Sequence, residues 1–318
     1  MRVYLALSIS ITLLFLGCIA EPTLPDEIPE ELYLSIETGS EPYRACILQE
    51  RNELYVTNLL GSGENVSIID LDEYTTVANI DLEGNFTYGI EVDPSSQLVY
   101  VAAGDIHFID PSTREVVDCI SIGGSDAFDL EVTQTGEMFV SGMYEDCIYV
   151  IDLKSSSLTD TISCGSKPNG IVLSPDDSRL FVTCHDADLL EVINTSTHTK
   201  IASIPVGRNP VDVCTSLSGD MVYVTCSLSN SIYTVGSEEC QVVRVTEVGW
   251  RPNGLCLTAN GDYIYTACSR EISVVHRESG ILMGAFDAPL LTWGVTLNPQ
   301  AKEIYTTAES GYSVSVYR

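Results

Sequence analysis

The sequence predicts an all-β fold: a seven-bladed β-propeller whose last blade is completed by a strand from the start of the domain. Three recurring patterns predict this fold. The first, Gly-x-x-Pro, begins at Gly165, Gly207 and Gly249, which are 42 residues apart, and an earlier copy begins at Gly39, three such intervals before Gly165. A period of about 42 residues is typical of the blades of a propeller.

The second and third patterns follow the same period. The second pattern is an apolar-x-apolar-apolar run followed by a variable residue. It recurs at intervals of 40 or 42 residues and ends at Asp70, Asp110, Asp152, Asn194, Gly236, His276 and Arg318. The third pattern is a β-rich pentapeptide, Leu-Tyr-Val-Thr-Asn at 54–58, with related versions at 180–184, 222–226 and 264–268. Three independent patterns therefore agree on one period and on seven units.

Each unit contains four short runs of β-forming residues. In the fourth unit these runs lie at 170–174, 180–184, 189–193 and 201–206, and Pro175-Asp176-Asp177 forms a turn between the first two. Runs rich in Val, Ile, Tyr and Thr that are separated by turn residues predict strands. No segment after the first 18 residues has a sustained helical period of apolar residues. We therefore expect four strands in each blade and no helices.

The two ends of the domain predict how the ring closes. The seventh unit has only three runs, at 293–298, 303–307 and 313–317, and an unpaired run at 32–38 precedes the first unit. Ile36 lies 126 residues before Ile162, which belongs to the outermost run of the third unit. The N-terminal run therefore has the register of an outer strand, and pairing it with the seventh unit would cover an exposed sheet edge.

The segment before the domain predicts export. Residues 1–17 combine Arg2 with an apolar run that is shorter than the roughly 20 residues needed to span a bilayer, as in a signal peptide. The run ends in Phe15-Leu16-Gly17-Cys18, which resembles a prokaryotic lipobox, although Leu is usual in place of Phe15 and a small residue in place of Leu16. The resemblance implies lipidation of Cys18. Residues 18–31 then form a Pro/Glu-rich tether between the membrane and the domain at 32–318.

The charge balance excludes some partners. The chain has 45 acidic and 15 basic side chains, a formal net charge of −30. Nucleic acids and anionic lipid head groups are bound by Lys/Arg patches, so we expect no nucleic-acid partner and membrane attachment only through the N-terminal lipid. The acidity is compatible with a divalent cation or simply with a well-solvated exterior. No cofactor is predicted.

The repeat resembles a known family. Residues 54–58, followed by Val-Ser-Ile-Ile-Asp at 66–70, resemble the repeat of YVTN-family β-propellers, and Pro168-Asn169-Gly170-Ile171 resembles the opening of the same repeat. The resemblance covers residues 32–318. It implies a prokaryotic cell-surface or periplasmic propeller, without implying one activity, because unrelated functions share this fold.

Candidate binding residues lie where the innermost strand of each unit begins. The first position there reads, in ring order, Tyr43, Tyr88, Phe128, Asn169, Val211, Asn253 and Trp293. The second position reads Arg44, Gly89, Asp129, Gly170, Asp212, Gly254 and Gly294. The four aromatic residues fall on consecutive blades. Together with Arg44, Asp129, Asp212, Asn169 and Asn253 they predict a ligand site at the mouth of the channel. The alternative is that the aromatic rings only wedge between blades.

These residues support three hypotheses of function. The first is a surface-anchored scaffold that binds a protein, a peptide or a glycan at the channel mouth. The second is a propeller hydrolase of the lactonase type, which would need carboxylates that hold a metal or act as a base in the channel. The third is a structural protein of the cell envelope. Since the four histidines lie in no HExxH motif and no Gly-x-Ser-x-Gly motif is present, we predict no catalytic residues.

The cysteines also follow the repeat. Ten remain after Cys18, and an even number in an exported chain suggests disulfides. Cys184, Cys226 and Cys268 share one position of the repeat, while Cys46, Cys214 and Cys256 share another. They are interpreted either as disulfide partners, as a site for a soft metal, or as small buried apolar residues. The loop His185-Asp186-Ala187-Asp188 has ligand types for a divalent cation and is equally well explained as a solvated acidic loop.

Overall fold

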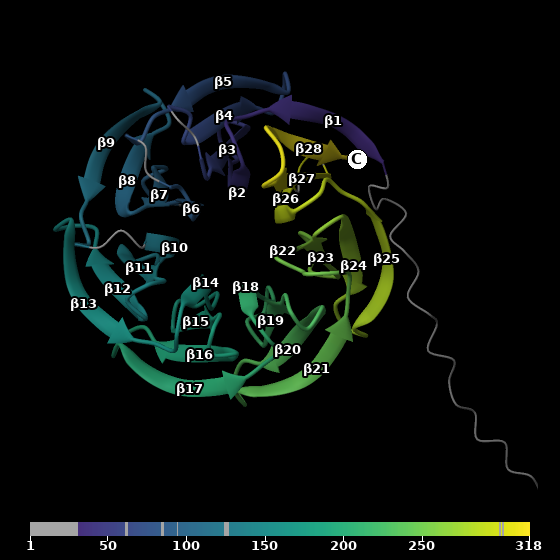
Figure 1. Cartoon of the computed structure of the whole chain (residues 1–318). Coiled ribbons are helices and arrows are strands. Elements are labelled where there is room, and N and C mark those ends of the chain that lie inside the picture. Colours follow the sequence, from purple (N-terminus) through teal and green to yellow (C-terminus); the bar gives the residue numbers. More distant parts are fainter. Residues whose placement is uncertain are drawn as a thin grey trace, which may run out of the picture.

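The computed structural model describes residues 31–60, 63–83, 86–93, 95–123, 127–298, 300 and 302–318. The predicted signal peptide, Cys18 and almost all of the predicted tether lie outside the described residues. Seven four-stranded antiparallel sheets are arranged radially, which confirms the predicted seven-bladed propeller (Figure 1). In the described part of the chain we find no helix of the length and hydropathy required to cross a membrane.

We number the blades along the chain and give each from its innermost to its outermost strand. Blades 1 to 4 are β2 (Pro42–Leu48), β3 (Glu53–Asn58), β4 (Val66–Asp70), β5 (Thr75–Ile80); β6 (Ile90–Val92), β7 (Val99–Ala103), β8 (Asp105–Asp110), β9 (Glu115–Ile120); β10 (Ala127–Val132), β11 (Glu137–Gly142), β12 (Cys147–Asp152), β13 (Ser157–Ser163); β14 (Pro168–Leu173), β15 (Arg179–Cys184), β16 (Leu189–Asn194), β17 (Thr199–Pro205).

The remaining three blades follow the same order. Blades 5 to 7 are β18 (Pro210–Thr215), β19 (Met221–Cys226), β20 (Ser231–Gly236), β21 (Gln241–Glu247); β22 (Leu255–Leu257), β23 (Tyr263–Cys268), β24 (Glu271–His276), β25 (Ile281–Asp287); β26 (Thr292–Asn298), β27 (Glu303–Ala308), β28 (Ser313–Tyr317), β1 (Leu32–Glu37). The observed strands differ from the predicted runs by one or two residues at their ends.

The N-terminal strand completes the last blade, as predicted. β1 pairs antiparallel with β28, and Ile36 lies opposite Val314 (Figure 1). Both side chains are buried in one apolar cluster with Leu54 and Val56 of blade 1. The closing strand therefore contributes to the core between the last blade and the first, in addition to covering the edge of β28.

The core lies between neighbouring blades. Tyr55 and Ile68 of blade 1, for example, pack against Val99 and Val101 of blade 2. The second and third strands of each blade are apolar on both sides because both faces are covered, whereas outer strands such as β13 are largely exposed. This distribution explains the apolar runs at the second and third strands that defined the repeat.

A recurring hydroxyl group links each blade to the next. In five blades, a Thr or Ser on the second strand donates a hydrogen bond to the carbonyl at the first position of the next innermost strand: Thr57 to Tyr88, Ser141 to Asn169, Thr183 to Val211, Thr225 to Asn253 and Thr307 to Tyr43. These bonds bring the beginnings of the innermost strands together at one end of the channel. The Thr of the pentapeptide pattern thus has a defined structural role.

The other two blades make the same link without a hydroxyl group. Their second strands carry Ala102 and Ala267 at this position. There the backbone N–H of Gly89 donates to the carbonyl of Phe128, and that of Gly254 donates to the carbonyl of Trp293, each at 2.7 Å. All seven carbonyls at the first position are therefore bonded to the preceding blade.

Candidate functional site

The mouth of the channel brings together the nine residues that the sequence predicted. Each of them lies at or next to the beginning of an innermost strand, and hydrogen bonds between blades hold these beginnings in a ring. Neighbouring strands of a blade are antiparallel, so two sets of loops lie at this end: those that lead into the innermost strands, and those between second and third strands. We call this end of the propeller the mouth face and the other end the opposite face.

The four aromatic residues pack on one another. The ring of Tyr88 stacks on that of Phe128, with centroids 4.7 Å apart. Tyr43 contacts all three others, with centroids 5.1 Å from Trp293, 5.9 Å from Tyr88 and 6.1 Å from Phe128. Since Tyr43 and Phe128 belong to blades 1 and 3, the rings reach beyond neighbouring blades, and we call them the aromatic cluster. Tyr43 and Phe128 are buried, whereas Tyr88 and Trp293 are half-buried.

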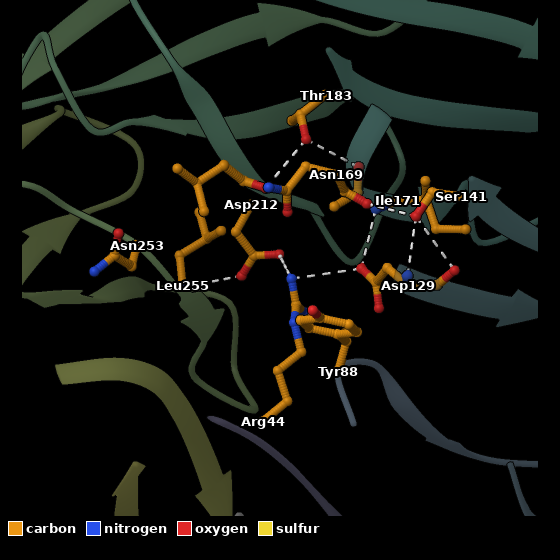
Figure 2. Close-up of polar contacts among 12 residues, drawn as sticks. Arg44, Tyr88, Asp129, Ser141, Asn169, Ile171, Thr183, Asp212, Asn253 and Leu255 are labelled. Carbon is orange, nitrogen blue, oxygen red and sulfur yellow. Dashed lines mark hydrogen bonds and ion pairs between the residues drawn. The ribbon is translucent and has the colours of Figure 1, made fainter. Parts of the chain in front are cut away.

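Arg44 joins the two aspartates across the channel. Its Nη2 lies 3.0 Å from Oδ1 of Asp212 and 3.5 Å from Oδ2 of Asp129, and Figure 2 shows the guanidinium group between the two carboxylates. Burial lowers the pKa of Arg44, but the charges of Asp129 and Asp212 outweigh burial, so this pKa is raised. The arginine therefore stays charged and links blades 1, 3 and 5.

Both aspartates also bind the backbone of the following blade. Oδ2 of Asp129 accepts the N–H of Ile171 at 3.1 Å, and Oδ2 of Asp212 accepts the N–H of Leu255 at 3.1 Å (Figure 2). A carboxylate that accepts a backbone N–H and pairs with a guanidinium group is held in place by charge-assisted bonds. In this geometry Asp129 and Asp212 act as links between blades, a role that their position in the sequence did not reveal.

The two predicted asparagines are also buried at the mouth. The side-chain amide of Asn253 donates to the carbonyl of Thr292 at 3.1 Å. Oδ1 of Asn169 has no hydrogen-bond partner among the described residues. The glycines of the second position are explained by close contact with the next blade: a Cβ on Gly89 would lie 2.8 Å from the carbonyl oxygen of Phe128.

Below the aromatic cluster the channel holds a cavity of about 260 Å³. Its lining includes two glutamates that the sequence comparison missed, Glu91 and Glu131, together with Arg44, Asp129 and Asp212. Glu91 and Glu131 occupy the fourth position of the innermost strands of blades 2 and 3. Side chains alternate along a strand, so positions two and four face the same way. Extending the comparison by two positions would have found both glutamates.

Burial raises the pKa values of Glu91, Asp129 and Glu131 in the channel. Burial, followed by the charge of Asp129, raises the pKa of Glu91 to about 7. Burial, only partly offset by the charge of Arg44, raises the pKa of Asp129 to about 6. Burial and the charges of Glu91 and Asp129 raise the pKa of Glu131 well above its ordinary value. Four carboxylates thus share the guanidinium group of Arg44, and those of Glu91, Asp129 and Glu131 lie on the neighbouring blades 2 and 3.

The mouth face also displays apolar side chains that the sequence did not single out. Apart from the outer strands, the large apolar side chains that are exposed in the described part of the chain lie almost entirely in mouth-face loops. They are Leu60, Phe86, Tyr144, Leu228, Trp250, Leu290 and Tyr312. On the opposite face only Leu217 is comparable. Exposed apolar residues that gather on one face are typical of binding surfaces.

The cysteines and the acidic loop form no metal site in the described residues. There, no group of three or more His, Cys, Asp or Glu side chains is arranged to hold a metal ion. None of the ten described cysteines forms a disulfide, and Cys184, Cys226 and Cys268 are fully buried in second strands, where burial raises their pKa values to about 12. In the loop at 185–188, Asp186 pairs with Lys167 and His185, each at 2.7 Å.

Comparison with known proteins gives no family for this chain. A scan against protein-family models finds no match, and a search of curated proteins finds no relative. We therefore infer the function from the fold and from the geometry of the mouth face.

Proposed function

We propose that this protein is a cell-surface-anchored binding scaffold whose ligand, a peptide or a carbohydrate, contacts the mouth face. The seven-bladed propeller is compatible in general with a binding scaffold or an enzyme. The observation that carries the proposal is the distribution of exposed apolar residues: seven on the loops of the mouth face and one on those of the opposite face, among the described residues. Exposing such side chains to water is unfavourable unless a partner covers them.

The proposal includes the mode of attachment. The lipobox-like Phe15-Leu16-Gly17-Cys18 and the Pro/Glu-rich residues up to 31 support a lipid anchor at Cys18 followed by a tether. The pentapeptide at 54–58 and its relatives support a place in the YVTN family. Metabolic labelling with a palmitate analogue tests the anchor: labelling should be lost with Cys18→Ser, and equal labelling of both forms would refute it.

Binding is tested with the domain from residue 31 to 318 on peptide and glycan arrays. Replacing Trp293 or Tyr144 by Ala should weaken binding, because Trp293 is half-buried and Tyr144 is exposed at the mouth face. Leu217→Ala, on the opposite face, is the matched control and should bind as the unmodified domain does. Equal binding by all four proteins would place the ligand elsewhere, and a complete lack of ligands would favour a structural protein of the cell envelope.

A propeller hydrolase of the lactonase type is a second candidate, which one observation favours. Glu91 lies in the channel cavity and has a pKa of about 7, and a carboxylate with such a pKa can accept a proton near neutral pH. The test is a panel of lactone substrates. Hydrolysis that is lost with Glu91→Gln would favour this candidate, and no hydrolysis by the unmodified domain would remove it.

A further inference from the structure

Three arginines on the mouth face have no ion-pair partner in the described part of the chain. Arg208, Arg251 and Arg270 are all exposed, and they lie in the loops that lead into blades 5 and 6 and in the loop between β23 and β24. This is unusual in a chain with three times as many acidic as basic side chains, 45 against 15. In such a chain, an arginine has many carboxylates with which it could pair.

Several other basic side chains form ion pairs or hydrogen bonds within the fold. Arg51 and Arg114 pair with Glu53, Arg179 with Glu238, Lys200 with Glu191, and Arg318 with Glu303. Arg244 donates to the carbonyls of Arg277 and Glu278, and Arg277 donates to that of Gly261. The guanidinium groups of Arg208, Arg251 and Arg270 differ from these side chains, because they have no ion-pair or hydrogen-bond partner among the described residues.

Hydrogen bonds hold the loops that carry these arginines in one continuous rim. The N–H of Leu228 donates to the carbonyl of Arg208 at 3.2 Å. Oδ1 of Asn230, in the same loop as Leu228, accepts the N–H of Arg251 at 3.0 Å. The N–H of Ser269, next to Arg270, donates to the carbonyl of Trp250 at 2.9 Å. The backbone of the rim is thus fixed, while its arginine side chains extend into solvent.

An exposed indole ring lies in the same rim. Trp250 is 59% exposed, and the guanidinium carbon of Arg251 lies 5.1 Å from its ring centroid. A guanidinium group binds a carboxylate through two parallel hydrogen bonds, and an indole ring offers a flat apolar surface beside it. A ligand that matches the rim therefore carries carboxylates spaced along its length and flat apolar faces between them.

We propose that this rim, defined by Arg208, Trp250, Arg251 and Arg270, binds a carboxylated polysaccharide. The inference rests on the proposed function, since it names a ligand class for the same face. A sugar ring with one carboxylate per repeat supplies both features that the rim requires. An acidic peptide fits less well, because the mouth face consists of loops and offers no free strand edge to which an extended peptide could add.

The test uses the domain from residue 31 to 318 with polygalacturonate at low ionic strength. Its methyl ester, which lacks the charge, and polyglutamate, which lacks the sugar ring, are the matched ligands. We expect binding of polygalacturonate alone, weakened by salt because exposed charges are screened. The triple variant Arg208→Gln/Arg251→Gln/Arg270→Gln and the single variant Trp250→Ala should each weaken it, the triple variant by about tenfold or more, roughly 1.4 kcal/mol.

Two variants on the opposite face serve as controls. Lys154→Gln removes an exposed basic side chain there, and Leu217→Ala removes an exposed apolar one, so both should bind polygalacturonate like the unmodified domain. Undiminished binding by the triple variant, equal losses in the controls, equal binding of polyglutamate, or no binding of polygalacturonate would each overturn the inference. The proposed function would survive any of these if another ligand depended on Trp293 or Tyr144.

Discussion

Certain turns of the two faces use their polar side chains differently. On the opposite face, four aspartates bond to serines of their own turn: Asp93 binds Ser95 and Ser96, Asp110 binds Ser112, Asp176 binds Ser174 and Ser178, and Asp220 binds Ser216 and Ser218. On the mouth face, three side chains bond to the backbone of another loop: Asp146 accepts the N–H of Lys167, Asp188 that of Asn209, and Asn230 that of Arg251.

The bonds on the opposite face stabilise single turns, whereas those on the mouth face fix the loops relative to one another. Lys167, Asn209 and Arg251 all have positive φ angles, between 50° and 54°, and the side chain that precedes each by 21 residues holds its backbone. The backbone of these mouth-face loops is therefore held in place by side chains of other loops. A preorganised surface loses less entropy when it binds.

The largest effect should come from the channel, which supports both faces. Replacing Arg44 by Met leaves the carboxylates of Asp129 and Asp212 without their guanidinium partner, so we expect the free energy of unfolding to fall by about 3 kcal/mol. Urea denaturation measures it. Adding Asp129→Asn and Asp212→Asn should restore part of the loss. An unchanged urea midpoint for Arg44→Met would show that the contacts of Arg44 with Asp129 and Asp212 do not stabilise the fold.

The pH dependence of stability should also reflect the channel. The folded-state pKa values of Glu91, about 7, and Asp129, about 6, lie above those of the unfolded chain, so the folded state binds more protons between about pH 4 and 7. The free energy of unfolding should therefore decrease, by about 2 kcal/mol, as the pH rises through this range. Glu91→Gln should flatten the curve, and Glu73→Gln, an exposed control on the opposite face, should not. A curve that rises with pH would contradict the assignment.

A smaller effect is expected from an opposite-face turn. The hydroxyl groups of Ser174 and Ser178 and the N–H of Ser178 donate to Asp176 and lower its pKa to about 2. Asp176→Ala should cost about 1 kcal/mol at neutral pH, measured by thermal unfolding. In the unmodified domain this contribution should fade as the pH falls from about 4 to 2. Ligand binding at the mouth face should be unaffected by Asp176→Ala. A binding defect would show that the opposite-face turns also contribute to binding.

The smallest effect on stability is expected on the mouth face itself. Tyr144 and Tyr312 are 66% and 67% exposed, so replacing either by Ser should change the free energy of unfolding by less than about 0.5 kcal/mol. Thermal unfolding would measure this, with binding followed in parallel. A loss above about 1 kcal/mol would mean that these rings support the fold rather than a ligand.

The repeat made part of the site predictable. The residues at equivalent positions in the seven units lie together around the mouth, because every innermost strand begins at the same end of the channel. The comparison stopped at the second position and so missed Glu91 and Glu131, which alternation along the strand places on the same side as Asp129. It could not show that Asp129 binds the backbone of Ile171, since that contact joins residues 42 positions apart.

The seven blades, their four strands and the closure by β1 could all be predicted from the sequence, because each follows from a local pattern repeated at a fixed interval. Which side chains remain available to a ligand depends on contacts between blades. Trp293 and Tyr88 are half-covered by neighbouring aromatic rings, while Trp250 is exposed on a braced loop. The exposure of a residue depends on which residues of other blades contact it. These contacts cannot be inferred from the residue's own segment of the sequence.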